Sequence, residues 1–313
     1  MKIVIAGGTG HVGSALTKYF LKAGHEVVLL SRGGQSAARV ALWDAVHAGS
    51  WFSEVDGSDL VINLAGRTVD CRYTQENLQQ MLDSRVFSTR IIGEAIRKAK
   101  SPPKLWLQMS TATIYAHRFT EANDEFTGII GGNEVGIPAY WKKSIDIAIA
   151  WEKTLAEAQT GKTRKVALRT AMVMGKHPES IFGVLSKMAR LGLGGAIGGG
   201  QQFVSWIHES DFISAVEFII QHEELNGAIN ICAPEPLPQK EFMRHLRKAL
   251  HVTIGFPATA WMAEIGAFIL RTDTELLLKS RRVQPGRLLK AGFQFKFPQW
   301  SLASQNLAEV RQK

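Results

Sequence analysis

The chain begins with a short apolar run, KIVIA, that leads into the glycine loop AGGTGHVG and then into an amphipathic helical pattern. Gly7, Gly10 and Gly13 have the spacing G-x-x-G-x-x-G. In a strand–loop–helix unit, one such glycine permits a tight turn, one lets the backbone approach a diphosphate, and one lets helix and strand pack closely. The loop N–H groups and the helix dipole stabilise negative charge. The loop, with His11 and Val12, is therefore predicted to bind the diphosphate of a dinucleotide.

Apolar runs without alternating polar residues recur after this loop. They are HEVVLLSR, DLVINLAG, KLWLQMST and RKVALRTAMVMG, and helical patterns separate them. Such strands predict a parallel sheet covered on both faces. We expect an α/β protein with a Rossmann-like doubly wound parallel sheet. Residues 1–170 would form the NAD(P)-binding Rossmann domain, with some later segments returning to it. Residues 171–313 would form a smaller C-terminal substrate-side lobe that includes a C-terminal helical segment.

Composition narrows the possible partners. The net charge is +9, but Lys and Arg are spread thinly, and the densest run, KSRRVQPGRLLK, is not interleaved with aromatic residues. We therefore expect no nucleic acid partner. Cys71 and Cys232 are isolated and the nine histidines lack metal-ligand spacing, so no metal site is expected.

Two features of the sequence bear on the expected location of the protein. The N-terminus enters a strand directly, without a signal-peptide pattern. The most apolar stretch, WMAEIGAFIL, is about half a membrane span and contains Glu264, so we expect a buried or docking helix there. The expected protein is cytoplasmic, with no membrane partner.

The end of the second strand bears on the choice of dinucleotide. An acidic residue there would bind the ribose hydroxyls of NAD, whereas this chain has Ser31 and Arg32. A guanidinium offers paired donors to a phosphate. NADP is therefore favoured over NAD as the cofactor. The alternative is that Arg32 is a solvated loop cation.

Several motifs resemble the extended short-chain dehydrogenase/reductases. They are GGTGHVG, NLAG, MSTATIY, LRTAMVMG and SWIHESDF. Longer strings, including DSRVFSTRIIGEAI, NICAPEPLPQKEF and LLLKSRRVQPGRLLKAGFQFKFP, resemble an atypical branch labelled epimerase family proteins, which end in a domain of unknown function. This resemblance implies NADP(H) binding without fixing a substrate. It also implies that Asn63, Leu64, Ala65 and Gly66 border the cofactor.

The same resemblance implies a catalytic Tyr followed four residues later by a Lys. Here Tyr140 is followed by Lys143 at the third place and by Ser144 at the fourth. The change from i+4 to i+3 swings a side chain about 100° around a helix. With Trp151–Glu152 aligned to the superfamily helix, the Tyr position falls on Ser144 and the Lys position on Ala148. The conventional pair therefore looks lost.

Other residues remain as catalytic candidates. The resemblance places Thr111, with Ser110 beside it, where a Ser or Thr assists catalysis. Tyr140 with Lys143 is one alternative, as a displaced pair, and Tyr115, recruited from the fifth strand, is another. Arg85 replaces a helix Asn of the superfamily and is predicted either to approach the nicotinamide or an anionic substrate, or to form a buried ion pair.

These features favour an NADP(H)-dependent oxidoreductase or epimerase-like enzyme with an atypical site and an unknown small-molecule substrate. The alternative is a non-catalytic NADP(H)-binding regulatory or redox-sensing protein, and a conventional nucleotide-sugar epimerase ranks last. An enzyme should have a cleft lined by converging polar groups, whereas a binding protein could fill that space with Trp206 or Trp261. Two long helices, from Glu76 and within residues 139–158, make a homodimer possible.

Overall fold

The computed structural model describes residues 1–34, 36–177, 180–262, 264 and 273–309. Its centre is a seven-stranded sheet in the order β10-β6-β5-β4-β1-β2-β3, in which every neighbouring pair is parallel. The strands are β1 (Lys2–Ala6), β2 (Glu26–Ser31), β3 (Arg39–Leu42), β4 (Leu60–Asn63), β5 (Leu105–Thr111), β6 (Arg164–Thr170) and β10 (Gly227–Ile231). The chain crosses the sheet in both directions from β1, which confirms the α/β, Rossmann-like doubly wound fold.

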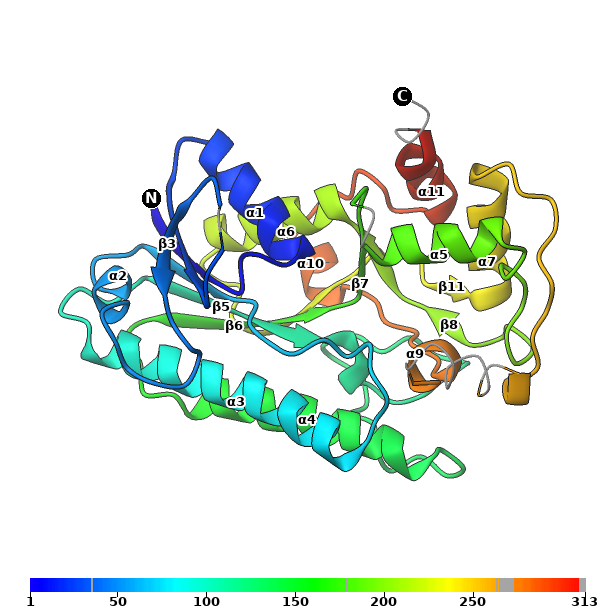
Figure 1. The fold of residues 1–313 in the computed structure, drawn as a ribbon, viewed down its shortest axis with the longest axis horizontal. Coiled ribbons are helices and arrows are strands. Elements are labelled where there is room, and N and C mark those ends of the chain that lie inside the picture. Colours follow the sequence, from blue (N-terminus) through cyan, green and yellow to red (C-terminus); the bar gives the residue numbers. More distant parts are fainter. Residues whose placement is uncertain (35, 178–179, 263, 265–272, 310–313) are drawn as a thin grey trace.

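Helices cover both faces of this sheet (Figure 1). Helices α1 (His11–Lys22) and α6 (Glu209–Gln221) pack together on one face, and α3 (Gln75–Lys98) and α4 (Ala139–Glu157) on the other. A single turn, α2 (Phe52–Val55), lies near α3. The central strands are buried from both sides, as Ile3 and Val4 of β1 show with no exposed surface. Their continuous apolar runs follow from this double covering.

The smaller lobe has a core of its own. Its elements are β7 (Met172–Met174), α5 (Ile181–Arg190), β8 (Phe203–Val204), β9 (Trp206–His208), β11 (Leu237–Pro238), α7 (Gln239–Ala249), α9 (Glu275–Leu278) and α11 (Trp300–Glu309), whereas α10 (Gly286–Lys290) packs against β10 of the large sheet. Trp206, Phe242 and Trp300 stack at its centre, with 4.1 Å between the rings of Phe242 and Trp300. Because α6 and β10 return to the Rossmann unit, the lobe is not one continuous stretch. The proposed division at residue 170 stays a prediction.

His208 and Asp211 tie the C-terminal segment to the start of α6. His208 Nδ1 accepts from the backbone N–H of Ser210 at 3.0 Å and so caps the helix. The Asp211 carboxylate accepts from the backbone N–H groups of Lys296 and Phe297 at 3.0 and 2.8 Å. Both side chains are engaged in shaping the turn and anchoring the chain behind it.

The outer face of α4 carries mostly charged side chains. Lys142 pairs with Asp146, and Ile149 is an exposed aliphatic residue on the same helix. The possible homodimer therefore stays a prediction. No helix in the described part of the chain is long and apolar enough to cross a membrane. Most of the stretch WMAEIGAFIL, including residues 265–270, lies outside the described residues, so its predicted helix is not addressed.

Candidate cofactor and substrate site

The glycine loop is built on close backbone approaches. Gly7 has φ +74°, and a Cβ there would lie 2.9 Å from the backbone N of Ala65. A Cβ on Gly13 would lie 2.5 Å from the Cα of Gly8. Both contacts are to backbone, which a larger side chain cannot displace cheaply. The loop therefore lies directly against the segment that follows β4.

The N-terminus of α1 suits a diphosphate. Its N-cap, Gly10, offers no side-chain cap, and the first turn contains no acidic residue. A Cβ on Gly10 would meet only the carbonyl oxygen of Gly7, at 3.9 Å, so the space in front of the helix is open. Uncapped N–H groups at a positive helix end bind anions. The loop thus fits the diphosphate that its spacing predicts.

Asn63 supports the wall opposite this loop. Its Nδ2 donates to Gln108 Oε1 at 3.0 Å, and its Oδ1 accepts from the backbone N–H of Ala65 at 3.0 Å. The backbone N–H of Leu64 continues the sheet by bonding to β1. The Asn63 side chain is fully buried. It therefore shapes the Leu64–Gly66 backbone, which lies closer to the loop.

Arg32 is a free cation in the described part of the chain. It is exposed just beyond β2 and has no ion pair or hydrogen bond to a described residue. By contrast, Arg39 nearby in the sequence pairs with Glu54 at 2.5 Å. Ser31 Oγ donates to the carbonyl of Gly33 at 2.7 Å and shapes the turn. An unpaired guanidinium at the end of β2 is suited to a ribose phosphate.

His11 and Val12 have different surroundings. Val12 packs against the apolar core. His11 Nε2 lies 3.2 Å from Glu209 Oε2, and its ring is 6.0 Å from that of His177. Burial lowers the pKa of His11, and Glu209 opposes that shift. The His11 side chain thus links the glycine loop to the start of α6 and the segment after β7.

Arg85 lies against the same wall from α3. Its side chain is 9% exposed, its Cζ would be 3.3 Å from a Cβ on Gly66, and it lies 5.0 Å from the centre of the Trp151 ring. Nη1 donates to the carbonyl of Met81 at 3.0 Å. No described carboxylate pairs with it, and burial lowers its pKa to about 10. The ion-pair alternative is thus not found among the described residues.

Ser110 and Tyr115 belong to a buried polar network. Ser110 Oγ donates to Glu152 Oε1 at 2.6 Å, and Glu152 pairs with Arg169 at 2.7 Å. Arg169 Nη1 donates to the Tyr115 hydroxyl at 2.8 Å. The two candidate residues are 3% and 2% exposed. The Ser110 hydroxyl thus joins β5 to α4, and the Tyr115 hydroxyl joins the segment after β5 to β6 and, through Asn230, to β10, so both are engaged within the fold.

The position expected for the superfamily Tyr is occupied by the C-terminal segment. Ser144 Oγ donates to Glu275 Oε1 at 2.7 Å, and Lys279 Nζ lies 3.4 Å from the same oxygen. The side chains of Glu275 and Lys279 have no exposed surface. Lys279 Nζ also donates to the carbonyl of Thr113 at 2.8 Å. We name Ser144, Glu275 and Lys279 the buried triad.

The buried triad reaches the end of β5, where Thr111 lies. Thr111 Oγ1 accepts from the backbone N–H of Thr113 at 3.1 Å and caps the short 3-10 helix η1 (Ala112–Ile114). Ala148, at the place of the superfamily Lys, is packed among apolar residues. Burial lowers the pKa of Lys279 to about 8, while Glu275 opposes the shift. Beside Ser144 the structure thus has a buried carboxylate–ammonium pair.

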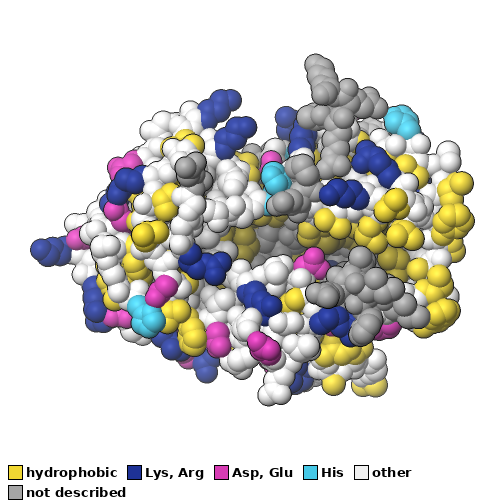
Figure 2. Space-filling view, viewed as in Figure 1, with side chains coloured by type: hydrophobic (Ala, Val, Ile, Leu, Met, Phe, Trp, Pro, Cys, Tyr) yellow, Lys and Arg dark blue, Asp and Glu magenta, His cyan; other side chains and the backbone are white. Residues whose placement is uncertain are grey.

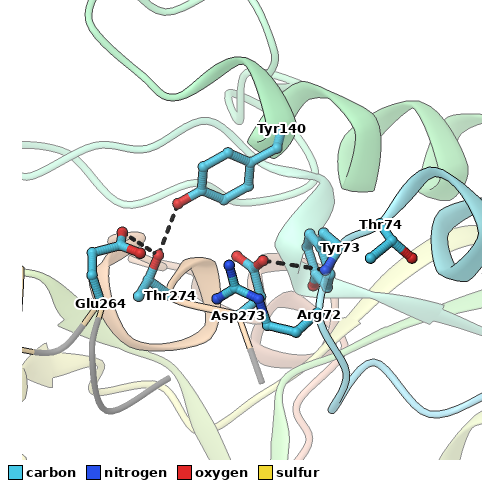
Figure 3. Close-up of a pocket in the computed structure, with 7 residues that line it drawn as sticks. All are labelled: Arg72, Tyr73, Thr74, Tyr140, Glu264, Asp273 and Thr274. Atoms are coloured by element: carbon cyan, nitrogen blue, oxygen red, sulfur yellow. Dashed lines mark hydrogen bonds between the residues drawn. The ribbon is translucent and has the colours of Figure 1, made fainter. Parts of the chain in front are cut away.

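Tyr140 lies one helical turn before Ser144, on the same face of α4. It lines a cavity of about 190 Å³ (Figure 3). The cavity residues are Arg72, Tyr73, Thr74, Tyr140, Glu264, Asp273 and Thr274. The Tyr140 hydroxyl lies 2.8 Å from Thr274 Oγ1, which donates to Glu264 Oε1 at 2.7 Å. Because a threonine has one hydroxyl hydrogen, Tyr140 must be the donor to Thr274.

This hydrogen-bond direction leaves the lone pairs of the Tyr140 oxygen available on the cavity side. Burial raises the pKa of Tyr140, so the phenol is neutral at neutral pH. Lys143 is exposed, and no hydrogen bond within the described residues joins it to Tyr140. Tyr140 is thus backed by a hydroxyl and a carboxylate rather than by a lysine.

Neither of the two tryptophans considered as space-fillers lines this cavity. Trp206 is buried in the core of the smaller lobe, and Trp261 is 65% exposed. The cavity keeps several polar groups that converge from three segments. Across the described ranges, no group of three or more His, Cys, Asp or Glu side chains is placed to hold a metal ion.

Sequence reasoning missed the residues that complete the site from the C-terminal side. Glu275 and Lys279 have the i, i+4 spacing of a helical ion pair, which was a readable signal. The run KSRRVQPGRLLK, which begins with Lys279, entered the sequence analysis only as the densest run of Lys and Arg. In the structure Lys279 is buried, and Arg281 donates to Thr113 Oγ1 and to nearby carbonyls. Thr274 and Glu264 carried no comparable signal.

The fold and the glycine loop together define a dinucleotide-binding protein of the doubly wound class. Residues 3–232 match the model of the NAD dependent epimerase/dehydratase family, and residues 258–307 match a domain of unknown function. The chain belongs to the NAD dependent epimerase/dehydratase family.

Individual proteins agree with this assignment. The chain is 31% identical over 312 residues to the human epimerase family protein SDR39U1, covering 98% of this chain and 99% of that protein. A crystal structure of human SDR39U1 (isoform 2) with NADPH aligns with a TM-score of 0.84 at 29% identity, covering 99% of each chain. UDP-N-acetylglucosamine 4-epimerase from Bacillus cereus aligns with a TM-score of 0.73 at 15% identity over the full length of both chains, which shows the shared fold alone.

Proposed function

We propose that this protein binds NADP(H) and acts as an oxidoreductase or epimerase-like enzyme with an atypical proton-transfer site. The observation that carries the cofactor part is the uncapped start of α1 together with the unpaired cation Arg32 beyond β2. That a similar human protein has been solved with NADPH supports the same choice. The substrate is a small molecule of unknown identity.

The residues of this chain would hold the cofactor in three places. The N–H groups at the start of α1 would bind the diphosphate. Arg32 would bind the 2′-phosphate through its paired donors. The Leu64–Gly66 backbone, with Arg85 behind Gly66, would border the remainder of the dinucleotide. Once bound, the nicotinamide supplies the hydride chemistry.

Tyr140 would act as the group that accepts the proton from the substrate or donates it back. Its oxygen is placed to accept the hydroxyl hydrogen of an alcohol substrate from the cavity side. Its own hydrogen then passes to Thr274 Oγ1, and the Thr274 hydrogen passes to the Glu264 carboxylate. In the opposite direction the same three groups return a proton to a developing alkoxide. This geometry matches general acid–base catalysis through hydrogen-bonded groups.

A non-catalytic role is the second candidate, because the buried triad occupies the place of the usual Tyr and Lys. In that reading the protein binds NADP(H) and responds to its redox state, and the cavity beside Tyr140 holds a ligand that is not transformed. Turnover separates the two candidates.

The cofactor proposal is tested by fluorescence titration with NADPH and NADH. Wild type should bind NADPH more tightly than NADH. Arg32→Gln should weaken NADPH by about tenfold, because a charge-assisted hydrogen bond contributes about 1.5–3 kcal/mol, and should leave NADH unchanged. The matched control is Arg97→Gln at the exposed end of α3. Equal affinity of wild type for both dinucleotides, or an equal effect of the control, would contradict Arg32 as the phosphate ligand.

The catalytic proposal is tested by NADPH oxidation with a panel of carbonyl compounds and nucleotide sugars. Tyr140→Phe should lower kcat by about 100-fold or more while leaving the affinity for NADPH unchanged. Thr274→Val, which removes the relay hydroxyl but keeps the shape, should lower kcat less. Turnover that survives Tyr140→Phe rules out Tyr140 as the acid–base group. NADPH binding without turnover of any compound supports the non-catalytic candidate.

A further inference from the structure

The smaller lobe exposes a group of large apolar side chains. Leu191 is 75% exposed, and Phe256 and Trp261 are each 65% exposed. We define the apolar patch as Ile181, Val184, Leu191, Leu193, Ile254, Phe256, Trp261 and Met262. Single exposed apolar residues are ordinary, but a contiguous group marks an interaction surface.

Backbone hydrogen bonds place the central part of the patch, which comes from two segments, side by side. The N–H of Phe256 donates to the carbonyl of Gly192, and the N–H of Ala258 donates to that of Ala196, each at 2.8 Å. A Cβ on Gly192 would lie 3.2 Å from the Phe256 ring. Residues 191–198 and 254–258 therefore run side by side. Figure 2 shows hydrophobic side chains gathered on this flank of the molecule.

Cations border the patch. Helix α5, which carries Ile181 and Val184, packs against α7. The exposed cations of the two helices are Lys187, Arg190, Lys240, Arg244 and Lys248. The single acidic residue within these two helices, Glu241, is paired with Arg244 at 2.7 Å. The two helices beside the patch therefore carry a net positive charge, and Lys and Arg side chains are visible beside the hydrophobic side chains in Figure 2.

We propose that the apolar patch and its basic border dock this protein on an anionic phospholipid bilayer. An interfacial site combines aromatic and aliphatic side chains, which enter the headgroup region by about 5–10 Å, with Lys and Arg that attract anionic lipids. The projecting Leu191, Phe256 and Trp261 provide the first, and the cations of α5 and α7 provide the second. A bilayer also accepts side chains of unequal length, whereas a protein partner must match their shape.

This proposal differs from the sequence-based expectation of no membrane partner. That expectation rested on the N-terminus, which lacks a signal-peptide pattern, and on the most apolar stretch, which is too short to span a membrane. Folding brings together cations from residues 187–190 and 240–248, which lie far apart in the sequence. The proposal does not depend on the proposed enzymatic function.

The test is co-sedimentation of the full-length protein with vesicles of phosphatidylcholine alone and of phosphatidylcholine mixed with phosphatidylglycerol. Wild type should bind the mixed vesicles, more weakly as salt is added, and should not bind the neutral ones. Phe256→Asp should reduce binding at least about tenfold. Lys187→Gln and Arg190→Gln should each reduce it about fivefold.

Two variants on the far side of the molecule are matched controls. Ile149→Asp and Lys153→Gln make the same kinds of change on exposed positions of α4 and should bind like wild type. Circular dichroism and the Tm of every variant check that the fold is kept.

Four results would overturn the proposal. Three of them concern vesicle binding: no binding of wild type to the mixed vesicles, equal binding of wild type to neutral vesicles, and equal losses of binding in the control variants. A fourth is a concentration-dependent dimer, seen by analytical ultracentrifugation, that Phe256→Asp dissolves while vesicle binding is absent, since the patch would then be covered by a second copy of the chain.

Discussion

The residues expected to bind the cofactor and the residues on the proposed catalytic side are held in place in different ways. The cofactor side uses backbone from neighbouring segments: the glycine loop from Gly7 to Gly13 and the wall from Leu64 to Gly66. The catalytic side uses side chains from distant segments, since Ser144 and Glu275 are 131 residues apart. The cofactor side has the glycine spacing of the family, whereas the proposed catalytic side is built from side chains that lie far apart in the sequence.

The difference shows which part of such a site can change. Backbone contacts around a bound diphosphate need particular φ values and particular close approaches, which only glycine permits at Gly7 and Gly13. A side-chain group can be replaced whenever another segment supplies a partner. Here α9 supplies Glu275 and Lys279 to the position that Ser144 leaves open. If this comparison holds, changes on the two sides should have separable effects on stability and on cofactor binding.

The largest effect is expected from breaking the buried triad. Lys279→Met leaves two buried acceptors, the Glu275 carboxylate and the Thr113 carbonyl, without the Nζ donor, which should lower the free energy of unfolding by about 3–5 kcal/mol. Urea denaturation measures the loss. NADPH affinity at temperatures where the variant is folded should be unchanged, because Lys279 contacts η1 and α9 rather than the glycine loop.

The control for this variant is Lys153→Met. Lys153 pairs with Glu157 on the exposed face of α4, at the same i, i+4 spacing. Exposed pairs contribute about 0–1 kcal/mol, so this variant should be nearly as stable as wild type. Similar losses in both variants would show that the buried triad has no special place in the fold.

On the cofactor side, Gly13→Val should weaken the binding of NADPH and also cost about 1–3 kcal/mol of stability through overpacking. A side chain at Gly13 meets the backbone of Gly8 and pushes α1 away from the loop. The N–H groups at the start of α1 then no longer meet the diphosphate, so the affinity for NADPH should fall about 100-fold. Lys18→Val, the same β-branched residue on the exposed face of α1, is the control and should bind normally. Normal binding by Gly13→Val would mean that the dinucleotide lies elsewhere.

The contrast between backbone contacts and side-chain contacts also explains which features of the fold and site could be predicted from the sequence. The fold class is confirmed, because apolar strands and glycine spacing are local signals. Ser110 and Tyr115 also lie at the end of β5 as expected, but their hydroxyl partners, Glu152 and Asn230, come from other elements. No local sequence pattern predicts such hydrogen-bond partners. The burial of Lys279, in a run that looked solvated, is likewise a property of tertiary packing.

The pH dependence of stability offers a weaker effect on the catalytic side. Burial lowers the pKa of Lys279 to about 8, against about 10.4 in an unfolded chain. Between these values the unfolded chain holds a proton that the native state has lost, so stability relative to a Lys279→Met reference should rise with pH. The expected gain is about 2 kcal/mol across this window, measured by urea denaturation at several pH values. A difference that stays flat would place the Lys279 pKa near its ordinary value.

The smallest effect should come from Ser144→Ala. The change removes the hydrogen bond from Ser144 Oγ to Glu275 Oε1 but leaves Lys279 paired with the same carboxylate. One hydrogen bond to a buried charged group is lost, so the free energy of unfolding should fall by about 1.5 kcal/mol, well below the loss in Lys279→Met. A double-mutant cycle of the two changes should give a coupling energy of about 0.5 kcal/mol or more. Additive losses would mean that Ser144 and Lys279 do not act on one carboxylate, and the catalytic side would then not be held together by the buried triad.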